Sequence, residues 1–119
     1  MEEHIRAIYS QWNEENLDGV LAAFQALGPK GYTIEYIGNA PLDGEAAVRD
    51  MWENYGGTCT TDIAQLIVNG DEAAALIDNN VKGDGQVTTI PSIETYHVKD
   101  GVLNVRYFHQ TPEGTYLQD

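Results

Sequence analysis

The sequence predicts an α+β fold, in which three N-terminal helices pack on one face of a strongly curved, mostly antiparallel sheet. Apolar residues recur at helical spacing in three stretches before Gly56, and from Thr60 onward they alternate as in strands separated by glycine turns. Helices followed by a run of strands are typical of this class. A chain of 119 residues has the size of one domain, so we expect a single domain over residues 1–119.

The first helix is predicted from Glu2 to Asn13, because four apolar residues form a stripe at i, i+3, i+4 and i+7. These residues are Ile5, Ile8, Tyr9 and Trp12. A second helix restarts around Asp18, whose carboxylate can accept hydrogen bonds from the free N–H groups of the next turn. Its apolar face consists of Val20, Leu21, Phe24 and Leu27. The segment from Gly28 to Gly31 should end it, because Pro29 cannot continue a helix and glycine accepts the left-handed conformations of a C-cap.

A strand is predicted from Tyr32 to Ile37, and its alternation places Tyr36 on the face of Ile34. The segment from Asn39 to Gly44 is rich in turn residues and predicts an irregular connection. A third helix follows from Glu45 to Tyr55. Its stripe consists of Val48, Met51, Trp52 and Tyr55.

The rest of the chain predicts an antiparallel meander. Its strands are expected over residues 60–69, 72–82, 86–98 and 102–109, and residues 110–119 form an irregular tail. In the third of these strands, alternation places a carboxylate on a face that is otherwise mostly apolar or aromatic, shared by Ile90, Ser92, Glu94, Tyr96 and Val98. Glu94 is therefore either a solvated carboxylate on a half-exposed strand or an acid that faces a pocket.

The charge balance excludes two classes of partner. Six Lys and Arg residues against 19 Asp and Glu residues give a formal net charge of −13. Such a chain repels phosphate backbones and anionic lipids, so we expect it to bind neither nucleic acid nor membranes. The single Cys59 offers no internal disulfide, and the N-terminus has neither the basic segment nor the apolar run of a signal peptide, so a cytoplasmic location is expected.

Three segments carry a resemblance to a known family, together with the predicted order of elements. They are NLDGVLAAF in the second helix, PLDGEAAVRDMWENY in the third, and ETYHVKDGVLNVRYFH at the last hairpin. The chain from about Ile5 to His109 resembles the nuclear transport factor 2-like superfamily, and within it the SnoaL-like and ketosteroid isomerase-like group. The resemblance implies a cone-shaped α+β barrel of the cystatin-like kind, with a pocket at its open end and a homodimer through the outer sheet face.

The resemblance also implies roles for particular residues. Glu94 matches the position of an acid that, in the isomerases, is kept neutral by its apolar site and donates a hydrogen bond to the substrate. Tyr36 occupies the place of the isomerase's proton-abstracting Asp, which argues against steroid isomerisation, and Tyr9 lies one residue from the place of the oxyanion-binding Tyr. His109 follows Tyr107 and Phe108, where related cyclases and hydrolases carry a key acid.

Further residues are candidates for binding a substrate. The resemblance implies that Asn79 lies on the concave face of its strand, where it could contact a ligand carbonyl, orient Glu94 or be satisfied by the backbone. Trp12, Met51 and Tyr55 belong to helical stripes that either form core or line the mouth of a pocket, and Tyr96 shares the face of Glu94. The three His residues have no metal-ligand spacing with Cys or carboxylates, so we expect neither a metal nor a cofactor.

Two functional hypotheses remain open at this point. In the first, the protein is an isomerase, cyclase or dehydratase that binds a small apolar molecule with a carbonyl group and moves a proton. Glu94 is then the general acid and His109 the general base. In the second, the same pocket belongs to a non-catalytic ligand-binding or dimerisation module.

Overall fold

The computed structural model describes residues 1–109, so the predicted tail lies outside the described residues. Its helices are α1 (Glu2–Asn13), α2 (Leu17–Leu27) and α3 (Gly44–Tyr55). Its strands are β1 (Gly31–Tyr36), β2 (Leu42–Asp43), β3 (Cys59–Asn69), β4 (Glu72–Gly83), β5 (Gln86–Lys99) and β6 (Val102–His109). Each predicted helix and main strand is present, with ends that differ by at most two residues.

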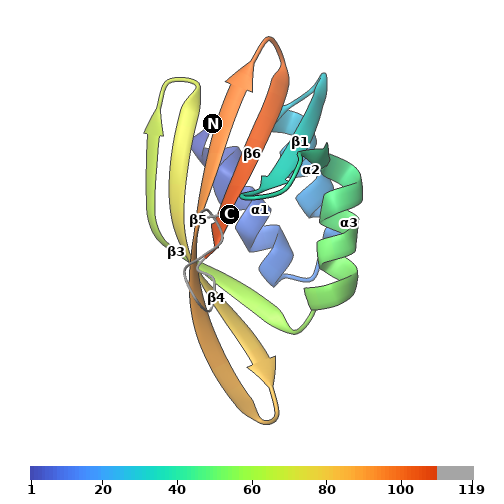
Figure 1. The fold of residues 1–119 in the computed structure, drawn as a ribbon, viewed down its shortest axis with the longest axis vertical. Coiled ribbons are helices and arrows are strands. Elements are labelled where there is room, and N and C mark those ends of the chain that lie inside the picture. Colours follow the sequence, from blue (N-terminus) through green and yellow to red (C-terminus); the bar gives the residue numbers. More distant parts are fainter. Residues whose placement is uncertain (110–119) are drawn as a thin grey trace.

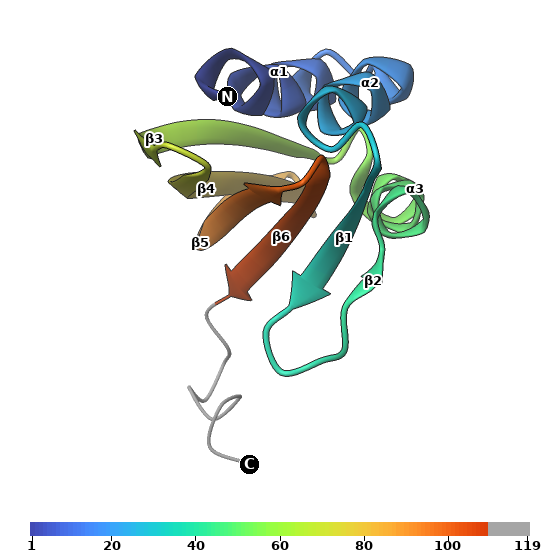
Figure 2. The same cartoon turned by 90° about the horizontal axis from the view of Figure 1, so that it is seen from above.

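The strands form one curved sheet in the order β2-β1-β6-β5-β4-β3. All pairs are antiparallel except β1 with β6. Helices α1 and α2 lie together on one side of this sheet, and α3 lies beside β1 and β2 (Figure 2). The predicted α+β cone is confirmed, and its sheet is open, with β2 and β3 at the two edges.

The predicted end of the second helix is confirmed, but the prediction that Asp18 caps its beginning was wrong. The second helix begins with Asn16 as its N-cap, and the side chain of Asn16 accepts a hydrogen bond from the backbone N–H of Gly19 at 3.1 Å. Asp18 instead lies inside the first turn. At the other end, Gly28 has a φ of −121°, so it is not left-handed. It is required for space, because a Cβ there would lie 2.5 Å from the carbonyl oxygen of Gly31.

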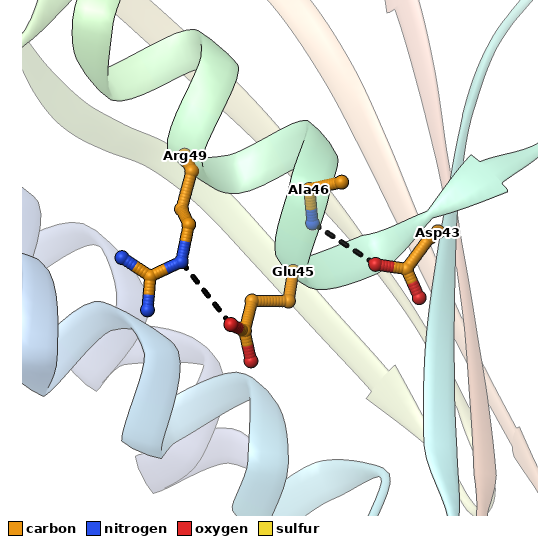
Figure 3. Close-up of polar contacts among 4 residues, drawn as sticks. All are labelled: Asp43, Glu45, Ala46 and Arg49. Atoms are coloured by element: carbon orange, nitrogen blue, oxygen red, sulfur yellow. Dashed lines mark hydrogen bonds and ion pairs between the residues drawn. The ribbon is translucent and has the colours of Figure 1, made fainter.

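The connection predicted from Asn39 to Gly44 contains β2, which pairs with β1. Its last residue, Asp43, is also the N-cap of α3 and accepts a hydrogen bond from the N–H of Ala46 at 3.1 Å (Figure 3). In the first turns of α3, Glu45 forms an exposed ion pair with Arg49 at 3.1 Å (Figure 3). This short strand therefore fixes where α3 begins, next to the edge of the sheet.

A β-bulge in β3 keeps the concave face of the sheet continuous. The register with β4 runs from Ile63 opposite Ile77 to Gln65 opposite Leu76, which leaves Ala64 without a partner. The extra residue moves the inward positions of β3 from odd to even numbers, so Ile63 and Leu66 both pack against the core. Bulges also bend a strand, as the curvature of the sheet here requires.

The core lies between the helices and the concave face of the sheet. Its largest fully buried side chains are Tyr96, Phe24, Ile5, Ile34, Ile77 and Leu103. On the convex face, by contrast, Ile67, Leu76 and Ile93 are exposed. The β4–β5 hairpin extends beyond the body of the molecule (Figure 1). No helix within residues 1–109 is long and apolar enough to cross a membrane.

Candidate functional site

A cavity of about 300 Å³ lies between the three helices and the concave face of the sheet. Its lining is mainly apolar and aromatic, and it includes both predicted catalytic residues. The predicted site residues that line it are Tyr9, Trp12, Tyr36, Met51, Tyr55, Asn79, Glu94 and His109. Tyr96 is the exception, because it is fully buried behind Tyr9 rather than in the lining.

Glu94 is the buried acid of this cavity, with 7% of its surface exposed. It lies on the inward face of β5, between the buried residues Ser92 and Tyr96. Of the two alternatives that the sequence left open, the structure has the acid that faces a pocket. Both of its carboxylate oxygens accept hydrogen bonds. Tyr9 of α1 donates to Oε1 at 2.6 Å, and Ser92 donates to Oε2 at 2.9 Å. The carboxyl group is therefore held in one orientation from two sides.

Asn79 fixes the direction of the hydrogen bond from Ser92. Its Nδ2 lies 3.0 Å from the carbonyl oxygen of Ile90 and 2.9 Å from Ser92 Oγ. A backbone carbonyl can only accept, so the nitrogen of the amide must face it, and the same nitrogen then donates to Ser92. The hydroxyl proton of Ser92 is left for Glu94. Asn79 thus orients Glu94 indirectly, through its hydrogen bond with Ser92.

Two tyrosines complete this network on the opposite side of Glu94. The hydroxyl groups of Tyr9 and Tyr96 lie 2.6 Å apart. With the single proton of Tyr9 directed at an ionised Glu94, Tyr96 is the donor of the second hydrogen bond. The network connects α1 with β5 over 85 residues of sequence between Tyr9 and Glu94.

Burial dominates the ionisation of these groups. It raises the pKa of Glu94 above the ordinary value of 4.5, and the hydrogen bonds from Tyr9 and Ser92 oppose part of this effect. Burial also raises the pKa values of Tyr9 and Tyr96 well above 10.0, and the negative charge of Glu94 adds to it. Both phenols therefore stay protonated when Glu94 ionises.

His109 lies at the end of β6 on the same face as Tyr107, opposite Ser92 of β5. Its ring centroid is 6.0 Å from that of Tyr36 and 6.0 Å from that of Tyr107. Partial burial lowers the pKa of His109 below 6.5, so the imidazole is mostly neutral at pH 7 and able to accept a proton. Burial raises the pKa of Tyr36 to about 12, which removes it as a base at neutral pH.

The helical residues of the site form the wall opposite the sheet. Trp12 donates from its indole nitrogen to the carbonyl oxygen of Cys59 at 2.8 Å, and its ring packs edge-on against Trp52 with centroids 5.2 Å apart. Met51 packs against the core, whereas Tyr55 is 51% exposed. These residues of the helical stripes are thus partly core and partly cavity wall.

Sequence reasoning missed two polar residues of the cavity. Ser92 was noted only for sharing the face of Glu94, without a role of its own, and Tyr107 only as part of the Tyr-Phe pair before His109. Tyr107 lies directly opposite Glu94 in the β5–β6 register and lines the cavity. The signal that could have found both residues is the alternation itself, because each shares the inward face of its strand with a predicted site residue. Within residues 1–109, no group of three His, Cys, Asp or Glu side chains could hold a metal ion, and the absence of metal and cofactor stays a prediction.

Comparison with known proteins gives a consistent result for the fold. The family model of the SnoaL-like domain matches residues 5–105. Among solved structures, a nuclear transport factor 2-like protein of unknown function from Burkholderia pseudomallei is 18% identical with a TM-score of 0.73, covering 98% of this chain and 95% of that one. A putative SnoaL-like polyketide cyclase from Jannaschia is 17% identical with a TM-score of 0.71, covering 89% and 82%.

A third similar structure comes from a co-crystallisation. TerC, co-crystallised with polyporic acid, is 14% identical with a TM-score of 0.70, and the match covers 90% of this chain and 88% of TerC. At these identities the likeness is one of fold. No protein of curated function matches the chain significantly.

Proposed function

This chain belongs to the SnoaL-like domain family, and from its cavity we propose that it binds a small apolar molecule with a carbonyl group and moves a proton on it. The reaction would be that of an isomerase, cyclase or dehydratase. One observation carries the proposal: a buried carboxyl group, with its pKa raised, faces a mainly apolar cavity of about 300 Å³. Such groups are typical of acid–base sites.

The proposed roles follow from the ionisation of the two groups. Glu94, which burial favours in its neutral form, would donate its proton to the carbonyl oxygen of the substrate. His109, neutral at pH 7, would accept a proton from the carbon next to that carbonyl. The product is an enol, and the reverse transfers complete an isomerisation when the proton returns to a different carbon. Tyr9 and Asn79 orient Glu94 through the network described above.

Two of the structural relatives support a role in binding small molecules. TerC was crystallised with polyporic acid, and the Jannaschia protein is described as a putative polyketide cyclase. We therefore expect ligands with conjugated rings and carbonyl groups to be the best starting point for a screen. The cavity's aromatic lining suits such rings.

A hydrogen-exchange assay tests the proton transfer without knowledge of the natural substrate. Aryl ketones would be incubated with the protein in D₂O, and deuterium at the carbon next to the carbonyl followed by NMR. We expect exchange faster than in buffer, and about a hundredfold or greater loss in Glu94→Gln and His109→Ala, as for other general acid–base residues. Exchange that persists unchanged in both variants would refute these roles.

A non-catalytic binding module is the second candidate. The observation that favours it is that both oxygens of Glu94 already accept hydrogen bonds from Tyr9 and Ser92, which suits a structural acid as well as a catalytic one. Saturable binding of a ketone without any deuterium exchange would support this alternative. The two candidates therefore share one assay and differ in its result.

We also propose that the protein is a homodimer through the convex face of the sheet, as the resemblance implies. The exposed residues there include Ile67 at 59%, Ile93 at 47% and Leu76 at 38%. Apolar side chains at this density are a typical feature of interfaces. Light scattering at micromolar concentration would give the mass of a dimer, and a monomeric mass would exclude it. The cytoplasmic location stays a prediction.

A further inference from the structure

The cavity holds few hydrogen-bond donors that a ligand could use. Both hydrogens of Asn79 Nδ2 are directed at Ile90 and Ser92. The hydroxyl protons of Ser92 and Tyr9 are directed at Glu94. On the side of the cavity formed by α1, β4 and β5, the donors other than a protonated Glu94 are therefore already bonded within the protein.

Two more groups that line the cavity also donate their hydrogen bonds within the protein. The indole N–H of Trp12 donates to the carbonyl oxygen of Cys59 at 2.8 Å. The hydroxyl group of Thr61 donates to Asn13 Oδ1 at 3.1 Å. Both bonds hold α1 against β3. The wall formed by these elements thus has no strong donor left for a ligand among the described residues.

The opposite wall, formed by β1 and β6, is different. Tyr36 and Tyr107 are register partners on these parallel strands, and their ring centroids lie 5.5 Å apart. Both line the cavity, and Tyr107 is only 5% exposed. Neither hydroxyl group forms a hydrogen bond with another of residues 1–109. Tyr107 is buried, and buried hydroxyl groups generally have a partner, so the partner expected for it is a molecule in the cavity. Tyr36 is half-buried and lines the cavity beside it, so its hydroxyl group is free for the same molecule.

We propose that Tyr36 and Tyr107 are the hydrogen-bond donors that recognise an acceptor oxygen, a carbonyl or enolate, on the bound molecule. This inference rests on the proposed function and specifies which wall of the cavity recognises the ligand. Tyr107 lies directly opposite Glu94 in the β5–β6 register, so an oxygen bound by the tyrosines is also next to the buried acid. Tyr9, whose proton is committed to Glu94, supports the site as a positioning residue.

The charges of the residues that line the cavity indicate whether the ligand's acceptor oxygen is neutral or charged. None of the described residues that line it is Lys or Arg, while Glu94 contributes the only carboxyl group among them. A permanently charged carboxylate ligand would be buried there without a counter-ion, which is strongly unfavourable. Burial raises the pKa of Tyr36 to about 12 and that of Tyr107 well above 10.0, so both remain donors at neutral pH. The site therefore suits a neutral ketone.

A matched set of probes tests this inference. Dissociation constants would be measured by fluorescence for 2-acetylnaphthalene, which has a carbonyl oxygen, for 2-ethylnaphthalene, which has none, and for 2-naphthoate, which is charged. The variants are Tyr36→Phe, Tyr107→Phe and the double variant. Tyr32→Phe is the control, because Tyr32 is a buried tyrosine on the same face of β1 that does not line the cavity itself and stacks on Phe24, which does.

We expect each site variant to weaken the binding of 2-acetylnaphthalene about threefold to tenfold, the usual contribution of one neutral hydrogen bond. Binding of 2-ethylnaphthalene should not change, which separates a lost hydrogen bond from a damaged cavity. Tyr32→Phe should leave both probes unaffected, and 2-naphthoate should bind more weakly than the ketone. The carbonyl stretching frequency of the bound ketone should rise in Tyr107→Phe, because its hydrogen bond is lost.

Two results would overturn the inference in different ways. If both neutral probes bind and the Phe variants bind the ketone as tightly as wild type, the tyrosines are not the donors, and the proposed cavity function stands. If neither probe binds wild type, the proposed function fails, and the inference fails with it. Binding of 2-naphthoate as tight as that of the ketone would contradict the preference for a neutral oxygen.

Discussion

Glu94 is subject to opposing effects at the residue scale. Burial favours its neutral form, while the hydrogen bonds from Tyr9 and Ser92 favour its charged form, and burial is the larger of the two. Its pKa is therefore raised even though both oxygens accept hydrogen bonds. This balance makes the stability of the protein depend on pH in a direction opposite to that of a salt-bridged carboxylate.

The first prediction concerns that pH dependence. The pKa of Glu94 in the folded protein lies above its ordinary value of 4.5. Ionisation of Glu94 therefore destabilises the fold, and the loss of stability develops as the pH rises from about 4.5 through the pKa of the folded state. Glu94→Gln removes the ionisation, so its stability relative to wild type should increase between pH 4 and pH 7.5. Urea denaturation at the two pH values measures this change. Glu53→Gln, an exposed substitution in α3, should show no such trend, and a flat difference for Glu94→Gln would contradict the raised pKa.

The second prediction concerns Ser92. Ser92→Ala removes a donor to Glu94 and leaves Asn79 without one acceptor, so the pKa of Glu94 should rise further. The free energy of unfolding should fall by about 1–3 kcal/mol. An NMR titration of the Glu94 carboxyl carbon checks the first effect and urea denaturation the second. Ser10→Ala, at an exposed position of α1, is the control, and an unchanged Glu94 titration in Ser92→Ala would show that the bond is unimportant.

Sequence alternation predicted the face of each site residue but not its partners. It separated each strand into two faces and placed Glu94 on a mostly apolar one, because a strand's period of two is a local property. That Asn79 lies on the concave side followed from the resemblance. Alternation could not show that Tyr9 meets Glu94, because that contact joins residues 85 apart on a helix and a strand. The role of Ser92 was overlooked for a similar reason, since its hydrogen bond with Asn79 joins two strands.

At the scale of elements, the helices were predicted best because their apolar stripes are long. The two-residue strand β2 was missed, since it has no periodicity and exists through its pairing with β1. The cap of α2 was assigned to Asp18 because both Asn16 and Asp18 are good N-cap residues, and local sequence does not show which one has non-helical geometry. The parallel pairing of β1 with β6 also has no local signature.

The third prediction tests the cap of α2. Asn16→Ala removes the hydrogen bond to the N–H of Gly19 and should lower the free energy of unfolding by about 1 kcal/mol. Asp18→Ala keeps that cap and removes only a favourable interaction with the helix dipole, so it should lower stability by less. Thermal or urea denaturation of the two variants side by side gives the comparison. A larger effect of Asp18→Ala would restore the assignment made from sequence.

At the scale of the whole molecule, the formal charge of −13 opposes any association between copies. The proposed dimer would bring two such chains together through the convex face. Added salt screens this repulsion, so dimerisation should strengthen as ionic strength increases.

The fourth prediction follows from that balance. Light scattering at low and at physiological salt should give a larger dimer fraction at the higher salt concentration. Ile93→Glu should shift the protein towards monomer, because it adds a charge to the exposed apolar face. Leu42→Glu adds the same charge on the edge strand β2 and should have a smaller effect. Equal effects of the two substitutions would argue against the convex face as the interface.

The parallel pairing of β1 with β6 has a consequence for the order in which the protein folds. Ile34 pairs with Val105, so two segments far apart in the sequence must meet before either is fully bonded. Closing so long a loop is entropically unfavourable and slow compared with forming the β3–β4 and β4–β5 hairpins. During synthesis on the ribosome, β1 therefore cannot form its parallel pairing until β6 has emerged. The wall that carries Tyr36 and Tyr107 is then the last part of the cavity to form, and the cavity of the nascent chain stays incomplete until β6 is in place.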